Sequence, residues 1–389
     1  MTEKKSINIL ESLISFDTTS FKSNLNLINY IQTYLKKYNI DSSLIYDSSK
    51  KKANLFATIG PDKDGGIMLS GHTDVVPTKE QNWSSDPYVL TKKKDKLYGR
   101  GTSDMKGFIA LVLSRVPFMV SANLSEPIHL AFSYDEELGC IGAYRLIDFI
   151  ENHSIKPSAC IVGEPTNMEV VIGHKGKCSH EVEINGLACH SGQAPLGVNA
   201  INYAAKLINK IDEIANEKSI QGPFDYDYEI PYTTLHTGVI KGGSVLNIVP
   251  DKCLLEFEIR HLLEDDPNEL IKEIKKYASE NLEPSMKKIS DLSKIIFKKK
   301  ISYPSLLIDQ NNKLVLSIKK ILKNNKHKKV IFGTEGGLFQ EKLNIPSIVC
   351  GPGSIDQAHK ADEFIEINQL EMGGLFLDGL LSSIKSNTN

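Results

Sequence analysis

Histidines and carboxylates stand at the ends of several short apolar segments of this 389-residue chain. The motifs that carry them are "SGHTDVVP", "YGRGTSDMKG", "DEELG", "GEPT" and "SIDQAHKADE". The candidate metal-ligating or acid–base residues in these motifs are His72, Asp74, Asp104, Glu136, Glu137, Glu164 and His359. Zinc and cobalt accept imidazole together with carboxylate, whereas Ca²⁺ and Mg²⁺ prefer oxygen ligands alone. The residue types therefore favour a transition metal, or a pair of them.

Each motif has an ordinary alternative when it is taken alone. Asp104 precedes a helix and could simply cap it, because aspartate is favoured at helix N-termini. An isolated His-x-Asp is usually an ordinary histidine, and an acidic pair at a strand end is usually a solvated turn. Taken together, five motifs at strand ends would meet at one edge of an open α/β sheet, where such sheets bind their ligands. Carboxylates crowded there lose hydration and repel one another, and bound divalent cations would remove that conflict.

The spacing of His72 and Asp74 adds a second detail to this site. Residues i and i+2 of an extended strand project to the same side. We therefore expect the carboxylate of Asp74 to hydrogen-bond the imidazole of His72 and to orient it, as carboxylates do for many metal-bound histidines.

The segments that must position these residues alternate between strand and helix up to about residue 177. Strands are predicted over 66–71, 128–134 and 159–164, with helices over 105–120 and 142–152 between them. Near-continuous apolar strands separated by helices indicate an α/β domain with a buried sheet. After about residue 294 the pattern resumes. It predicts helices over 312–324, 335–343 and 369–384 and strands over 328–332 and 346–351.

The segment between these two stretches has a different pattern. It begins with an alternating, half-exposed strand, 178–186, and a long amphipathic helix, 197–214. Two strands, a helix and a last strand near 286–297 follow, which together describe a small α+β domain. We therefore predict a catalytic metal-binding domain in two parts, 1–177 and 294–389, with an inserted ferredoxin-like α+β domain over 178–293.

Composition limits the possible partners and compartment. The net charge of −2 argues against a nucleic-acid or membrane-surface partner. No apolar run reaches the ~18 residues that a membrane helix needs, and the N-terminal segment is typical of an amphipathic helix rather than a signal peptide. Six scattered cysteines without a C-x-x-C pair fit reduced, buried residues and a cytoplasmic protein. Arginine is rare, with only Arg100, Arg115, Arg145 and Arg260, so each one raises a question of its role.

The ordered set of motifs resembles the dinuclear zinc deacylases and exopeptidases. That family includes acetylornithine deacetylases, succinyl-diaminopimelate desuccinylases, aminoacylases and glutamate carboxypeptidases, and the resemblance runs from about residue 8 to 384. It implies two divalent metal ions, zinc or alternatively cobalt. It places His72 and Glu164 on one metal, Glu137 and His359 on the other, and Asp104 as a bridge between them. It also implies a cis peptide bond after Asp104, and it identifies the inserted domain as a lid that pairs two subunits into a homodimer.

The same resemblance assigns roles to further residues. Glu136, which precedes a ligand, would take the proton of a water molecule as that water attacks the amide, and would pass it to the leaving amine. His190 would donate to the oxyanion, from its own subunit or from a partner. Arg260 would grip the substrate's α-carboxylate with its planar guanidinium. Further candidates for substrate contact are Asn247, Thr334, Lys175 and, for a cationic amine, Glu335.

Three further stretches, "GHKGK", "PYTTLHTGVIKGG" and "GPGSIDQAHKADEF", are most similar to the acetylornithine deacetylase branch of the family. They predict an enzyme of arginine biosynthesis that hydrolyses N²-acetyl-L-ornithine to L-ornithine and acetate, with a small N-acyl amino acid as its ligand. Succinyl-diaminopimelate desuccinylase, or another deacylase or dipeptidase of the family, stays an alternative. A metal-binding protein without catalysis is disfavoured because a binder needs no base such as Glu136. The glycines near Arg100 do not fit the dinucleotide pattern G-x-G-x-x-G.

Overall fold

The structure is a computed structural model that describes residues 2–386. The chain divides into two compact units, and each is described by itself. Residues 174–305 and 330–333 form the second unit, and the rest of the described chain forms the first. The predicted insert covers 178–293, and the second unit extends beyond those bounds at both ends.

The first unit is built on a nine-stranded mixed sheet. Its strand order is β1-β2-β6-β3-β7-β15-β8-β13, and β14 pairs with β8. The strands β6, β3, β7 and β15 are neighbours and run parallel, whereas β1, β2 and β8 pair antiparallel with their neighbours. These strands are β1 (Ser42–Tyr46), β2 (Ala53–Ile59), β3 (Ile67–His72), β6 (Ile128–Ser133), β7 (Ala159–Pro165), β8 (Val170–His174), β13 (Leu306–Leu307), β14 (His327–Val330) and β15 (Ser347–Gly351).

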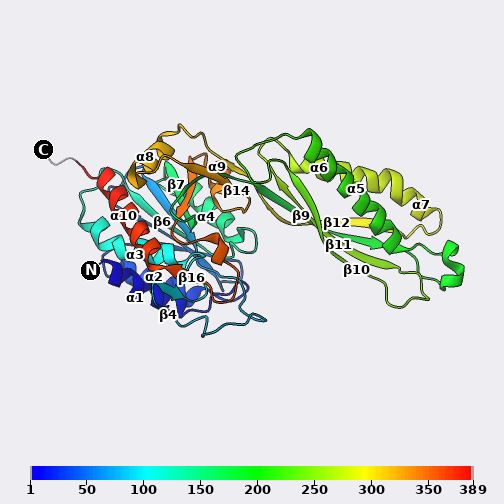
Figure 1. Cartoon of the computed structure of the whole chain (residues 1–389), viewed down its shortest axis with the longest axis horizontal. Helices are drawn as coiled ribbons and strands as arrows, with labels where there is room; N and C mark the ends of the chain where they lie inside the picture. Colours follow the sequence, from blue (N-terminus) through cyan, green and yellow to red (C-terminus); the bar gives the residue numbers. More distant parts are fainter. Residues whose placement is uncertain (1, 387–389) are drawn as a thin grey trace. The chain divides into compact units, whose positions relative to one another are not determined.

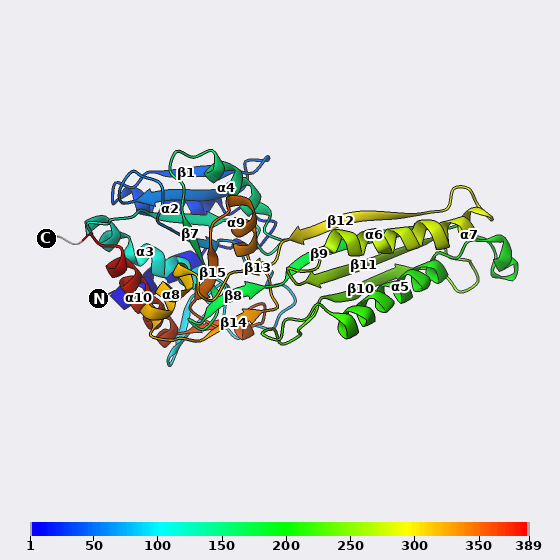
Figure 2. The same cartoon turned by 90° about the horizontal axis from the view of Figure 1, so that it is seen from above.

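Helices cover both faces of this sheet (Figures 1 and 2). The helices α1, α3, α8 and α10 pack on one another, while α4 and α9 pack together on strands of the sheet. Two neighbouring residues of β6 show that α3 and α4 take opposite faces. Leu130 belongs to the core with α3, whereas His129 stacks on Phe56, which in turn contacts Phe149 of α4. The helices are α1 (Thr2–Ile14), α2 (Leu25–Lys36), α3 (Lys106–Ser121), α4 (Ile141–Glu151), α8 (Lys313–Leu322), α9 (Gly336–Leu343) and α10 (Ile367–Ser383).

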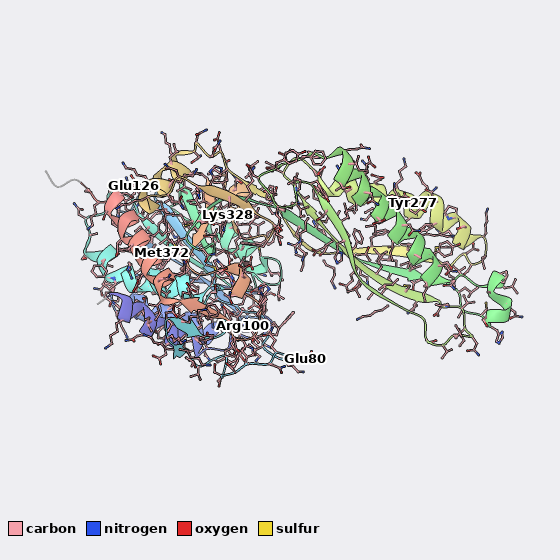
Figure 3. All side chains as sticks on the ribbon, in the orientation of Figure 1. Glu80, Arg100, Glu126, Tyr277, Lys328 and Met372 are labelled. Atoms are coloured by element: carbon pink, nitrogen blue, oxygen red, sulfur yellow. The ribbon has the colours of Figure 1, made fainter. Side chains whose placement is uncertain are left out.

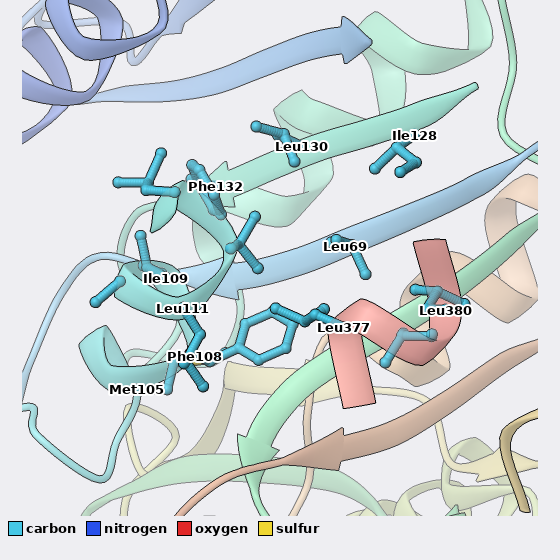
Figure 4. Packing of buried hydrophobic residues seen from close by; sticks show 14 of the residues in the cluster. Leu69, Met105, Phe108, Ile109, Leu111, Ile128, Leu130, Phe132, Leu377 and Leu380 are labelled. Carbon is cyan, nitrogen blue, oxygen red and sulfur yellow. The ribbon is translucent and has the colours of Figure 1, made fainter. Parts of the chain in front are cut away.

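The main core lies between the central strands and the helices α3 and α10. Leu69, Phe108, Leu130 and Leu377 pack there at 2% exposure or less (Figure 4). Every residue of β6 and β7 is buried, and accordingly both strands are largely apolar, apart from His129, until they reach polar residues at their carboxyl ends. A small separate sheet, β16-β5-β4, is formed by β4 (Thr91–Lys93), β5 (Lys96–Tyr98) and β16 (Phe364–Glu366).

The second unit has the strand–helix–strand–strand–helix–strand order of a ferredoxin-like fold. Its four-stranded antiparallel sheet has the order β10-β11-β9-β12. Buried residues alternate along β9 and β11, and α5 and α6 run along one face of the sheet (Figures 1 and 2). The elements are β9 (Gly176–Asn185), α5 (Ala200–Gln221), β10 (Thr234–Gly242), β11 (Lys252–His261), α6 (Pro267–Tyr277), α7 (Glu283–Lys287) and β12 (Lys294–Tyr303).

The prediction of a two-domain α/β protein is confirmed, but some details were wrong or missing. The last strand of the second unit is Lys294–Tyr303, not 286–297, because residues 283–287 form the short helix α7 instead. The strands β1 and β2 and the small sheet of β4, β5 and β16 were not predicted. Among the helices of residues 2–386, none is long and apolar enough to cross a membrane.

Candidate metal centre

The carboxyl ends of the parallel strands β6, β3 and β7 bring four predicted residues to one edge of the first unit's sheet. His72 is the last residue of β3, and Glu164 is the last but one of β7. Glu136 and Glu137 lie in the loop that follows β6. The sheet thus gathers one imidazole and three carboxylates from segments that are far apart in the sequence.

Asp104 reaches this edge from the loop before α3, and its two oxygens point to two different histidines. Its Oδ1 lies 3.0 Å from Nε2 of His72, and its Oδ2 lies 3.3 Å from Nε2 of His359. His359 itself comes from the loop after β15. The peptide bond between Asp104 and Met105 is cis, as the family resemblance implied. Asp104 is therefore placed between two groups of side chains.

The first group surrounds His72. Its Nε2 lies 3.5 Å from Oε1 of Glu164. One ligand atom each of His72, Glu136 and Glu164 falls within 4.8 Å of the other two. The side chain of His72 is only 1% exposed, and its other ring nitrogen, Nδ1, lies 2.9 Å from the main-chain oxygen of Asp74. The ring is thus held from behind with Nε2 facing the carboxylates.

The second group surrounds His359. Its Nε2 lies 3.1 Å from Oε1 of Glu137 and 3.3 Å from Oδ2 of Asp104. Asp104 therefore belongs to both groups. Ligand atoms of His72, Asp104 and Glu137 also lie within 4.8 Å of one another. The side chain of His359 is 54% exposed, in contrast to that of His72. The two groups therefore adjoin through Asp104, one buried and one near the surface.

The charges of the site are in conflict when the protein side chains are considered alone. Burial raises the pKa of Glu164 and of Glu136 well above the usual range, and neighbouring carboxylates add to the shift although His72 opposes it. Hydrogen bonds to Asp104 and Glu137 raise the pKa of His359 to about 10. Burial opposes a charge on His72, but the field of Glu164 and the bond to Asp104 still hold its pKa well above normal.

This donor set fits a pair of divalent cations. Each group offers one imidazole together with carboxylate oxygens. Asp104 lies between the groups and directs one carboxylate oxygen toward each. Buried acids that share so small a space repel one another unless a cation balances them. Mixed nitrogen and oxygen ligands are those of zinc and similar transition metals.

The two residues predicted to act beside the metals are placed differently from each other. Glu136 lines the first group, and its Oε1 accepts a 3.4 Å hydrogen bond from the thiol of Cys140. The carboxylate of Asp74 faces the ring of His72, with Oδ1 3.6 Å from Nδ1. It also accepts from the backbone N–H groups of Glu136 and Glu137, so it holds the loop that carries them.

Two more candidates, Thr334 and Glu335, lie in the first unit and are fully or almost fully buried. The hydroxyl of Thr334 accepts a hydrogen bond from the backbone N–H of Gly336, at the start of α9. Glu335 accepts from the hydroxyl of Ser70 through Oε2, and its Oε1 has no partner among the described residues. With 1% exposure, Glu335 lies within the protein rather than on an open pocket wall.

Arg260 and Lys175 belong to the second unit and line a cavity of about 340 Å³ there, together with Glu258 and Phe332. The guanidinium of Arg260 donates to Glu258 at 2.9 Å through Nε and to the hydroxyl of Tyr303 at 3.0 Å through Nη1. Burial lowers the pKa of Lys175 to about 8. This cavity therefore combines two cationic groups with one acid.

His190 and Asn247 form another pair within the second unit. They lie on adjacent segments, since His190 forms an isolated β-bridge with Ile248 and the main-chain oxygen of Asn247 accepts from Ser191. Both residues are exposed. Nδ1 of His190 accepts from the backbone N–H of Gly192, which leaves Nε2 as the free edge of the ring.

Two buried residues, Arg100 and Glu363, support the first unit's site, although the sequence did not assign a role to either of them. Arg100 and Glu363 are each 1% exposed and form an ion pair of 2.7 Å. Glu363 also accepts from the backbone N–H of Asp104. The rarity of arginine and the position of Glu363 shortly after His359 were the only signals of them in the sequence.

Comparisons with known proteins agree with this geometry. The sequence profile of peptidase family M20/M25/M40 matches residues 68–383. The acetylornithine deacetylase of Buchnera aphidicola subsp. Acyrthosiphon pisum is 32% identical over 369 residues, which cover 92% of this chain and 93% of that protein. The fold is similar to that of an M20-family metallo-carboxypeptidase from Sulfolobus solfataricus, with a TM-score of 0.77, 18% identity and coverage of 97% and 98%. It is also similar to that of a dinuclear metal-binding M20 peptidase from Bacillus subtilis, with a TM-score of 0.67, 13% identity and 98% of each chain covered.

Proposed function

The chain belongs to peptidase family M20/M25/M40 and is a hydrolase, and from that premise we propose that it releases acetate from N²-acetyl-L-ornithine to give L-ornithine. The observation that carries the chemistry is the placement of Asp104, with one oxygen toward each of two histidine–carboxylate groups. The choice of substrate is supported by the 32% identity to an acetylornithine deacetylase over nearly the whole length of both chains.

We assign His72 and Glu164 to one metal ion, Glu137 and His359 to the other, and Asp104 to both. The distances that support this assignment are those within the two groups. Zinc is the first candidate and cobalt the second, because both accept imidazole with carboxylate. Bound cations of this kind supply the Lewis acidity that polarises an amide carbonyl and acidifies a water molecule.

Glu136 is the proposed general base. It lines the group of His72 and Glu164, and its burial raises its pKa, which suits a carboxylate that must accept a proton and then release it. Glu136 takes a proton from the water whose oxygen adds to the acetyl carbonyl carbon. It then delivers that proton to the α-nitrogen as the carbon–nitrogen bond breaks, and acetate and the free amine leave. Asp74 supports this step indirectly, because it holds the backbone of Glu136.

Residues of the second unit are assigned to the recognition of the substrate. Arg260 is proposed to bind the α-carboxylate, since a guanidinium can donate two parallel hydrogen bonds to a carboxylate. Lys175 lines the same cavity, and Asn247 offers an exposed amide. His190 is the proposed donor to the oxyanion, and its exposed ring is free to meet a ligand. Thr334 stays a proposed contact from the first unit. We also propose that the chain forms a homodimer through its second unit.

The decisive assay compares acyl groups. Purified protein, supplied with Zn²⁺ or Co²⁺, is given N²-acetyl-L-ornithine, N-succinyl-diaminopimelate or a dipeptide, and the release of acetate, succinate or free amino acid is measured. We expect acetate release to have the highest kcat/KM. A higher kcat/KM with the succinyl substrate or the dipeptide would overturn the proposed substrate, and a lack of hydrolysis of all three would overturn the catalytic assignment.

A further inference from the structure

A buried carboxylate holds the loop that carries Asp104. Glu363 is 1% exposed, and its oxygens accept three backbone hydrogen bonds from that loop. Oε2 accepts from Gly101 at 3.0 Å, and Oε1 accepts from Ser103 at 2.9 Å and from Asp104 at 3.1 Å. Three N–H groups within four consecutive residues thus converge on one side chain. The backbone position of Asp104 is set by Glu363.

Arg100 links the same carboxylate to the loop of His359. Its Nη1 donates to Oε2 of Glu363 at 2.7 Å and to the main-chain oxygen of Lys360 at 3.2 Å. Its Nη2 donates at 2.6 Å to Oε1 of Gln81, whose own amide donates at 2.9 Å to the main-chain oxygen of His359. An unbroken path of hydrogen bonds therefore joins the backbone of Asp104 to that of His359. Arg100 is labelled on the first unit in Figure 3.

The loop of His359 needs such outside support. His359 and Asp362 have φ angles of 62° and 54°, a left-handed conformation that residues other than glycine seldom adopt. The side chain of His359 is 54% exposed, so packing around the ring does little to fix it. Its position therefore depends on the contacts of Nε2 with Asp104 and Glu137 and on the backbone that carries the residue. That backbone is held at Lys360 by Arg100 and at His359 by Gln81.

We propose that Arg100 and Glu363, with Gln81, are positioning residues that set the spacing between Asp104 and His359 and thereby create the second metal position. This inference rests on the proposed function and adds the reason why the two loops meet. A buried arginine–carboxylate pair is weak evidence for stability, because the cost of desolvation offsets the attraction between the charges. What distinguishes this pair is that both partners bind the backbone of loops that carry ligands.

Another buried arginine of the same unit provides the control. Arg115, 4% exposed, lies on α3 and pairs with Asp378 at 3.2 Å. Its Nη1 donates at 2.9 Å to the hydroxyl of Ser114 on the same helix, so its replacement tests the loss of a buried guanidinium without touching either ligand loop.

The test is a metal titration of the full chain. Arg100→Lys keeps the charge but cannot reproduce the fork that reaches Glu363, Lys360 and Gln81 together. Gln81→Met removes the hydrogen bonds that Gln81 forms with His359, Arg100 and Trp83, but it leaves the ion pair of Arg100 with Glu363 in place, so no buried charge loses its partner. Apoprotein is titrated with Co²⁺, followed by visible absorption, and with Zn²⁺, followed by calorimetry. We expect two equivalents in the unsubstituted chain. In both variants the second equivalent should bind about 10–100-fold more weakly, the usual effect of losing a residue that orients a ligand.

The outcomes separate this inference from the proposed function. The first equivalent should bind with unchanged affinity in both variants, and Arg115→Lys should leave both equivalents unchanged. If the unsubstituted chain binds two ions and both variants bind them equally well, the positioning role is wrong although the metal centre stands. The role is also wrong if Arg100→Lys and Gln81→Met weaken the two equivalents alike, since that indicates a general loss of structure. An unsubstituted chain that binds fewer than two ions would overturn the proposed function itself.

Discussion

The two units of the chain hold their candidate functional residues in opposite ways. In the first unit His72, Asp104 and Glu164 are at most 6% exposed and sit at the ends of buried strands or in loops tied by backbone hydrogen bonds. In the second unit His190 and Asn247 are exposed, and the neighbouring Leu246 is fully exposed. Most of the proposed metal ligands are thus anchored in a packed frame, with His359 as the exception, whereas His190 and Asn247 of the second unit lie on an accessible surface and Lys175 is buried.

The sheets of the two units also differ in how far their strands are buried. All residues of β6 and β7 are buried, so the first unit's sheet is covered on both faces. Along β9 the burial alternates, and only one face of the second unit's sheet is packed against α5 and α6. We therefore expect substitutions in the first unit to affect the chemical step and metal content, and those in the second unit to affect substrate affinity.

The largest effect is expected from Glu136→Gln. The amide cannot accept a proton, so kcat should fall by about 10²–10⁴-fold or more, the range that general base catalysis contributes. Metal content should stay at two per chain, because Glu136 is not among the proposed ligands. Steady-state kinetics and elemental analysis measure both quantities. Glu151→Gln, at the exposed end of α4, is the control and should change neither. Near-normal turnover in Glu136→Gln would remove the proposed base.

The next effect is expected from His359→Ala. Loss of a ligand should reduce the bound metal from two ions to one and lower kcat/KM by at least about 100-fold, the upper range for residues that act behind the ligands. Because its side chain is 54% exposed, the melting temperature of the metal-free protein should hardly change. His153→Ala, a histidine of the first unit that hydrogen-bonds Ile155, tests the specificity of the effect. Two ions retained in His359→Ala would contradict the ligand assignment.

A smaller effect of another kind is expected from Arg260→Gln in the second unit. The loss of charged hydrogen bonds, worth about 1.5–3 kcal/mol, should raise KM by about 10–100-fold. The value of kcat should change little if Arg260 binds the carboxylate equally in the ground and transition states. Lys177→Gln is a matched control, because Lys177 also pairs with Glu258 at 2.9 Å but does not line the cavity of Arg260. A fall in kcat at constant KM would show that Arg260 acts on the chemical step, and it would contradict the expectation that substitutions in the second unit affect substrate affinity.

The ease of prediction also differs between regions. The strand ends that carry His72, Glu136 and Glu164 could be found from the sequence, because buried parallel strands form apolar runs that stop at polar residues. The bounds of the strand β12 could not be predicted, since three consecutive lysines interrupt its sequence, "KIIFKKKISY", and hide its period. The hydrogen bonds that the Asp74 carboxylate accepts from the backbone of Glu136 and Glu137 could not be inferred from its spacing to His72.

The support behind the ligands was the least predictable part of the site. Glu363 binds backbone N–H groups of residues 101–104, which have no side-chain signature and lie some 260 positions away in the chain. Arg100 stood out only because arginine is rare here. Ligand types can be recognised from the chemistry of the side chains, but backbone contacts between distant loops require the folded structure.

The smallest effect concerns stability and lies in the second unit, where His180 stacks on Phe257 on the packed face of the sheet. Burial, with help from Lys275 and Lys299, lowers the pKa of His180 to about 4, against 6.5 in the unfolded chain. Between pH 6.5 and 4 the unfolded chain therefore binds a proton that the folded chain does not, so this residue makes the free energy of unfolding fall as the pH falls. His180→Gln removes that contribution.

Chemical denaturation of the metal-free protein at pH 7 and pH 5 measures this effect. The loss of unfolding free energy between the two pH values should be smaller in His180→Gln than in the unsubstituted chain. His236→Gln, at an exposed histidine of β10, should leave the loss as it is. An equal loss in all three proteins would show that the imidazole of His180 is not shielded in the folded state. The packed face of the second unit's sheet would then admit solvent to a greater extent than its alternating burial indicates. The difference in packing between the second unit and the first would be larger still.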